Sequence, residues 1–148
     1  MNREKGFTLL ELLTVIAIII ILAGILIPAV GKVRQKAKSA RAQADIESLC
    51  IAVKMYEADF GAYPPDVAGS NDFKAYIGVE LENTSIGDAG PYIEFREKDL
   101  SSGTFNDPWG KPYIYVEPGT HNEASFDIYS FGPNMTDNSG DSDDVTNW

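Results

Sequence analysis

The hydrophobic pattern of the chain opens with an apolar run over residues 7–30, in which Glu11 is the only ionisable side chain. A helix of this length reaches roughly 36 Å, which is enough to cross a hydrocarbon core of about 30 Å. The run is longer than the roughly 7 to 15 apolar residues of a cleaved secretory signal. Near its end, Pro28 lacks an N–H and crowds the carbonyl of Gly24, which predicts a kink or local melting between them. The pattern therefore predicts a membrane-spanning helix at 7–30.

Apolar residues then recur every three or four positions as far as Phe60, with charged residues between them. This spacing predicts an amphipathic helix over 31–61 that continues the membrane helix, and Gly61, which has no Cβ, suits its C-terminus. Cys50 falls on the apolar face and has no histidine near it in the sequence. We therefore interpret Cys50 as a core residue and not as a nucleophile.

The remaining residues, 62–148, are few for an autonomous core, so the amphipathic helix is expected to complete it. Aromatic and β-branched runs at 112–116 and 126–131, bounded by Gly, Pro and Asn, predict two antiparallel strands. Weaker patterns predict a short helix at 73–81 and a short strand at 92–96. The expected fold class is α+β, with a long N-terminal helix packed on a small antiparallel sheet.

Charge is divided unevenly along the chain, whose formal net charge is −10. Residues 1–60 carry 8 basic and 6 acidic side chains, whereas residues 61–148 carry 4 and 16. The acidic second half argues against nucleic acid as a partner, because phosphate binding depends on Lys and Arg. One cysteine excludes an intrachain disulfide and a four-thiolate zinc site. The only histidine, His121, has no evident partner for a catalytic triad, so no enzyme is predicted.

Glu11 requires an explanation, because a carboxylate is costly in a membrane helix, although less so near the helix end. It either sits at the membrane interface or has a cationic partner. The residues around it, KGFTLLELL at 5–13, resemble the signal of type IV prepilins and type II secretion pseudopilins. In those proteins a basic residue and Gly precede a cleavage site, Phe follows it, and Glu stands four residues beyond the Phe.

The resemblance implies a cut between Gly6 and Phe7 by a prepilin peptidase at the cytoplasmic face, followed by N-methylation of the new Phe7 amine. Gly6 suits that position because a protease subsite that holds the backbone closely leaves no room for a Cβ. In a filament, Glu11 would then pair with the Phe7 amine of a neighbouring subunit. Such pairing lowers the cost of burying both charges.

A basic run follows the membrane segment, with no acidic residue among Lys32, Arg34, Lys36, Lys38 and Arg41. The positive-inside rule alone would place this side of the membrane in the cytoplasm. The resemblance places the N-terminus there instead, and we follow it because the cleavage signal is the more specific observation. Anionic headgroups, filament neighbours and plain solvent all suit such a run.

A second block, DPWGKPY at 107–113, is followed by a strand, a Pro-Gly pair and FDIYS at 126–130. With the N-terminal signal, this block closely resembles the major pseudopilins of type II secretion systems, the protein G family of the general secretory pathway. Pro108 and Gly110 favour a turn and Trp109 is a large apolar plug, so we interpret the block as structural. The resemblance implies a pilin-like fold.

The C-terminal segment crowds four carboxylates, Asp137, Asp141, Asp143 and Asp144, into eight positions. Calcium takes about 6 to 8 oxygen ligands in flexible geometry, so it could fold such a loop; the alternative is a solvated acidic tail. The resemblance implies a calcium site that includes Asp144 and the carbonyl of Val145, together with Asn134 and the carbonyl of Phe131. Asn134 stands where that family usually has Asp. Asp141 and Asp143 are added as candidates on charge alone.

These features predict a structural protein with a leader at 1–6, membrane helix at 7–30, amphipathic helix at 31–61 and head at 62–148. Its N-terminus would be cytoplasmic and its head periplasmic, and it would polymerise with itself into a periplasmic pseudopilus that drives protein export. The implied partners are the prepilin peptidase, an inner-membrane assembly platform, minor pseudopilins and membrane lipid. Two alternatives remain: a type IV or DNA-uptake pilin subunit, and a membrane-anchored calcium-dependent binding module.

Overall fold

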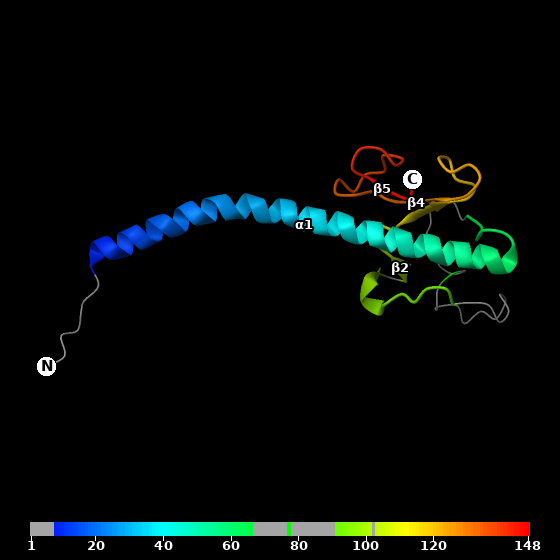
Figure 1. Ribbon diagram of the computed structural model, residues 1–148, viewed down its shortest axis with the longest axis horizontal. Coiled ribbons are helices and arrows are strands. Elements are labelled where there is room, and N and C mark those ends of the chain that lie inside the picture. The colour runs from blue at the N-terminus through cyan, green and yellow to red at the C-terminus, as the bar shows by residue number, and fades with distance from the viewer. Residues whose placement is uncertain (1–7, 67–76, 78–90, 102) are drawn as a thin grey trace. The chain divides into compact units, whose positions relative to one another are not determined.

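A single long helix, α1 (Leu9–Phe60), dominates the first part of the chain (Figure 1). The computed structural model describes residues 8–66, 77, 91–101 and 103–148. The predicted leader lies outside the described residues, and so does the predicted helix at 73–81 except for Ile77, which is helical.

The chain divides into two units, Met1–Ala37 and Lys38–Trp148, and α1 contributes to both. In the first unit α1 is the one helix among the described residues that is long and apolar enough to cross a membrane. Its large apolar side chains are exposed, from 46% at Val15 to 81% at Leu9. The helix runs through Gly24 and Pro28 without a break, so the local melting that the sequence allowed is not observed. Exposing so much apolar surface to water is unfavourable, so a lipid phase or another chain would be needed to bury these side chains.

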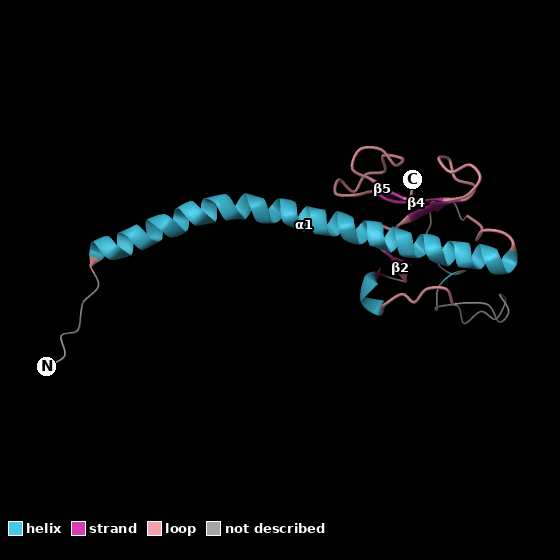
Figure 2. Ribbon diagram, in the orientation of Figure 1, coloured by secondary structure: helices cyan, strands magenta, loops and turns pink. Residues whose placement is uncertain are grey.

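The second unit contains all the described strands (Figure 2). The 3₁₀ helix η2 (Glu97–Asp99) leads into a hairpin of β1 (Leu100–Ser101) and β2 (Thr104–Phe105). A three-stranded antiparallel sheet follows, with β3 (Ile114–Val116), β4 (Asp127–Ser130) and β5 (Val145–Thr146) in that order. Tyr129 of β4 lies opposite Ile114 on one side and Thr146 on the other. The predicted α+β class is confirmed.

The two predicted strands at 112–116 and 126–131 are confirmed as the antiparallel pair β3 and β4, each slightly shorter. The predicted strand at 92–96 is wrong in extent, because within this range only Ile93 forms an isolated β-bridge. The N–H groups of Tyr92 and Ile93 both donate to the carbonyl of Ile77, at 3.0 Å each. Two successive donors on one carbonyl turn the backbone and cannot form an extended ladder.

The core lies between the second half of α1 and the sheet. Buried residues from α1, the hairpin and the sheet form one cluster: Ile46, Leu49, Ala52, Val53, Ile77, Phe105, Tyr113, Tyr115, Phe126 and Ile128. Two tyrosines tie this sheet to the rest, because Tyr113 donates to Asp45 of α1 at 2.9 Å and Tyr115 donates to the carbonyl of Pro64 at 2.8 Å. Burial, aided by the Asp45 charge, raises the pKa of Tyr113. The head is therefore completed by α1, as expected for so short a segment.

Candidate functional site

The N-terminus of α1 is closed by a reciprocal pair of side chains, Thr8 and Glu11. The Glu11 carboxylate accepts the Thr8 N–H at 2.8 Å and its hydroxyl at 2.7 Å, while the Thr8 hydroxyl oxygen accepts the Glu11 N–H at 3.2 Å. This is a capping box, which satisfies N–H groups that the first helical turn leaves unpaired. Gly6 and Phe7, the predicted cleavage and methylation positions, lie outside the described residues.

Glu11 therefore has a role within its own chain that the sequence interpretation missed. The spacing of Thr8 and Glu11 is the Ser/Thr-x-x-Glu pattern that predicts a helix start, so the signal was present in the sequence. The capping box does not exclude a cationic partner, because each carboxylate oxygen can accept more than one hydrogen bond.

The predicted calcium residues lie in and beside the loop that connects β4 to β5. Asn134 joins two parts of this loop, because its side-chain amide donates to Asp143 Oδ1 at 2.5 Å and its N–H donates to Asp143 Oδ2 at 2.9 Å. Its Oδ1 accepts the N–H of Thr136 at 2.7 Å. Gly132 has φ +63°, and a Cβ there would lie 2.0 Å from the Asp143 carbonyl oxygen. The loop is therefore folded on itself, with Asn134 and Asp143 in direct contact.

Asp144 is the predicted ligand whose environment best fits a cation. Its Oδ2 accepts the N–H groups of Asn138 at 3.1 Å and Gly140 at 2.9 Å, whereas its Oδ1 is buried and has no hydrogen-bond partner. Burial raises the pKa of this carboxyl, and the Asp137 and Asp143 charges raise it further. A buried, unpaired carboxylate oxygen costs free energy unless a cation neutralises it. Oxygen donors of this type suit calcium.

The four loop carboxylates do not converge on one point. No group of three or more His, Cys, Asp or Glu side chains in the described part of the chain is arranged to hold a metal. The carboxylates of Asp137 and Asp143 accept hydrogen bonds within the loop. The Asp141 side chain is exposed and has no hydrogen bond to another described residue. A cation here would rely on Asp144 and on neutral oxygens of the loop, not on a cluster of acids.

The Trp148 side chain packs against two other aromatic rings. The Trp148 ring stacks on His121 with centroids 4.1 Å apart and meets Tyr129 edge-on at 6.0 Å. A Cβ at Gly140 would lie 2.0 Å from the Trp148 ring, so only glycine fits beneath it. These contacts join the β4–β5 loop to the loop before β4.

Asp127 organises that second loop, and sequence reasoning did not single it out. This carboxylate is 1% exposed. It accepts the N–H of His121 at 2.8 Å, the N–H of Asn122 at 3.0 Å and the hydroxyl of Thr120 at 3.0 Å. Although burial opposes ionisation, these hydrogen bonds lower the pKa of Asp127. Asp127 lies within an apolar strand pattern, directly after Phe126 and before Ile128. Its charge in that pattern was the one signal in the sequence that could have identified it.

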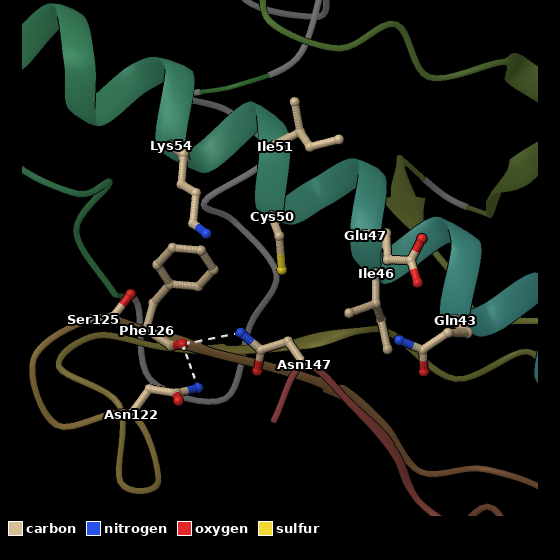
Figure 3. Close-up of a pocket in the computed structure, with 10 residues that line it drawn as sticks. All are labelled: Gln43, Ile46, Glu47, Cys50, Ile51, Lys54, Asn122, Ser125, Phe126 and Asn147. Carbon is tan, nitrogen blue, oxygen red and sulfur yellow. Dashed lines mark hydrogen bonds between the residues drawn. The ribbon is translucent and has the colours of Figure 1, made fainter.

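A groove of about 540 Å³ lies beside the second half of α1 (Figure 3). Its lining includes Cys50, and both Asn122 and Asn147 donate to the carbonyl of Phe126, at 3.2 and 3.1 Å. Burial raises the pKa of the Cys50 thiol, which keeps it protonated and unreactive. The side chain is partly buried and packs against the core cluster, in agreement with the core role inferred from sequence.

Two protein-family models match the chain. Residues 29–148 match "Type II secretion system (T2SS), protein G", and residues 1–27 match "Prokaryotic N-terminal methylation motif". The first match covers the second half of α1 together with the whole sheet and the loop that holds Asp144. The second covers the apolar start of α1 and its capping box.

Named relatives resemble the chain over nearly its full length. The type II secretion system core protein G of Pseudomonas aeruginosa is 33% identical, over 99% of this chain and 96% of its own. That of Escherichia coli K12 is 35% identical, over 99% and 92%. Among solved structures, the major pseudopilin from the type 2 secretion system of enterohaemorrhagic E. coli is 24% identical with a TM-score of 0.49, covering 78% of this chain and 86% of that one.

Proposed function

The chain belongs to the type II secretion system protein G family, and from this premise we propose that it is the structural subunit of a pseudopilus that drives protein export. One observation carries the proposal beyond family membership. In the first unit, the described part of α1 is apolar and its large side chains are not covered by other described residues. A membrane covers such a helix before assembly, and the helices of neighbouring subunits cover it in a filament.

We infer the following course for the subunit from the helix together with the family to which the chain belongs. The chain is anchored in the inner membrane by α1, with its N-terminus in the cytoplasm and its head in the periplasm. It then leaves the membrane to join a homopolymer, assisted by an inner-membrane platform and minor pseudopilins. The role that we propose is mechanical, because the chain belongs to a family of pseudopilin subunits.

Maturation requires a cut between Gly6 and Phe7 and methylation of the new amine. We expect Gly6→Ala to block processing, because the added Cβ would occupy the space where the peptidase holds the backbone. Mass spectrometry of the full chain produced with a prepilin peptidase would show Phe7 as a methylated N-terminus in the wild type and uncut chain in the variant. A wild-type N-terminus other than Phe7 would contradict the proposal.

We further propose that calcium binds in the β4–β5 loop, held by Asp144 and the carbonyl of Val145, with Asn134 and the carbonyl of Phe131 beside them. The buried, unpaired Oδ1 of Asp144 supports this assignment. Asp141 and Asp143 would add negative charge around the ion. Calcium would supply the positive charge that this acidic loop lacks and would fix the loop in one conformation.

Calcium is expected to raise the thermal midpoint of the full chain in detergent, followed by tryptophan fluorescence. An ion that binds only the native state stabilises it by about 2.7 kcal/mol at 100 times its Kd. For a chain of this size the midpoint would rise by roughly 5 to 10 °C relative to chelator. Asp144→Ala should abolish the rise.

The matched control is Asp137→Ala, which removes one carboxylate from the same loop but not a proposed ligand. It should retain most of the calcium-dependent rise. If the wild type shows no rise, the calcium proposal is wrong. If both variants lose the rise equally, the assignment to Asp144 is wrong and only the overall charge of the loop matters.

A further inference from the structure

The described head carries opposite charges on two flanks. On one flank, Arg41 and Lys98 line a cavity of about 410 Å³ whose wall includes Trp109. Lys38 lies over the same Trp109 ring, 5.9 Å from its centroid. We call Lys38, Arg41, Lys98 and Trp109 the basic pocket. On the other flank is the acidic β4–β5 loop. Figure 1 shows the hairpin side of the head and this loop on opposite sides of α1.

Two carboxylates, Asp99 and Asp107, also line this cavity, and both already accept hydrogen bonds or ion pairs from described residues. Asp99 is held by Arg41 at 2.6 Å and by Arg96. Asp107 is 5% exposed and accepts the N–H groups of Trp109 and Lys111 as well as the Ser130 hydroxyl. Lys98 forms no ion pair with another described residue and is exposed. Lys98, which follows the exposed Glu97 in the chain, is therefore the lining cation of this cavity that has no ion pair with a described residue.

The acidic flank presents the complementary group. Asp143 and Asp144 are engaged by N–H groups of their own loop, whereas the exposed Asp141 side chain has no such bond among the described residues. Two different patches that attract each other on one chain make a heterologous contact, which builds an open helical filament when its rotation does not close into a ring. Charge complementarity between such patches also sets register and suppresses wrong pairing.

We propose that the basic pocket of one subunit receives the acidic β4–β5 loop of the next, with Lys98 facing Asp141. This inference rests on the proposed function, because it assumes that the chain polymerises. It specifies which surfaces of neighbouring heads meet and makes the loop proposed to bind calcium part of the contact between subunits. We assign a second copy as the occupant because every subunit carries both the basic pocket and the acidic β4–β5 loop, so each subunit can bind the next.

The test is a charge exchange in the full chain, produced together with its assembly machinery, with sheared filaments measured by immunoblot. Lys98→Glu and Asp141→Lys should each lower filament yield by at least about tenfold, because each brings like charges together. The double variant should recover to within about threefold of the wild type, since the attraction is restored with its direction reversed. Lys54→Glu, a charge reversal elsewhere on α1, should leave the yield unchanged.

Cross-linking tests the same contact without reversing charge. In a Cys50→Ser background, Lys98→Cys combined with Asp141→Cys should give disulfide-linked dimers and a ladder of higher species in filaments. The pair Lys54→Cys and Asp141→Cys should give neither.

The outcomes separate this inference from the proposed function. If the wild type forms no filament, the proposed function fails. If it does, but the double variant is no better than the single variants and the cross-link is absent, the contact is wrong. A basic pocket that binds lipid headgroups instead would show yield loss in Lys98→Glu that Asp141→Lys does not repair.

Discussion

Replacing Glu11 with glutamine is expected to abolish filament assembly while leaving cleavage and the start of α1 intact. In the proposed filament the Glu11 carboxylate neutralises the Phe7 amine of a neighbouring subunit. Without it that amine would be buried with no counter-charge, which is the costly outcome for an ion pair that loses one partner. Filament yield from the full chain, measured after shearing, should fall by at least about a hundredfold.

The capping box makes Glu11→Gln the decisive change. Glutamine at this position can still accept the Thr8 N–H, as the Glu11 carboxylate does at 2.8 Å, so the helix start is kept. The matched control is Thr8→Val, which removes the hydroxyl bonds and keeps the carboxylate. If Glu11→Gln assembles normally and Thr8→Val does not, Glu11 acts by capping its own helix and the pairing proposal is wrong.

Asp127→Asn is expected to be the most destabilising conservative change in the head. The carboxylate accepts three backbone or hydroxyl donors and the Asn122 side-chain amide at 2.9 Å. An amide in its place would turn an NH₂ group toward donors and remove the charge that strengthens each bond. The loss of about 3 kcal/mol would lower the thermal midpoint by roughly 6 to 12 °C. Glu123→Gln, an exposed change in the same loop, should not move it.

The pH dependence of Asp127 has a definite sign. Because the folded-state pKa of Asp127 is lowered, its ionised form stabilises the fold above the unfolded-state pKa of about 3.9. This contribution is lost as the pH falls through the folded-state pKa. The stability difference between the wild type and Asp127→Asn should therefore shrink in acid below about pH 4. Tryptophan fluorescence would follow this change, since Trp148 stacks on His121 of the same loop. A difference that persists unchanged in acid would show that the charge is not what matters.

Local spacing predicted the elements that depend on nearest neighbours in the chain. The apolar run and the amphipathic pattern predicted α1, and the aromatic runs predicted β3 and β4. The two-residue strands β1, β2 and β5 are too short for an alternation of apolar and polar residues to predict them. The expected strand at 92–96 failed because its N–H groups turn toward Ile77, a partner that no local pattern specifies.

The sequence by itself determined that this chain has an apolar helix long enough to cross a membrane and a small acidic head, because hydrophobicity and charge act over a few consecutive residues. Only the tertiary structure decided which carboxylates are fully hydrogen-bonded in the fold and which one has an oxygen without a partner. Asp127 is buried and fully bonded, the half-buried Asp144 has one buried oxygen without a partner, and Asp141 is exposed. The physical reason is that burial and hydrogen-bond partners come from distant segments, as in the contact of Asp45 with Tyr113, 68 residues apart.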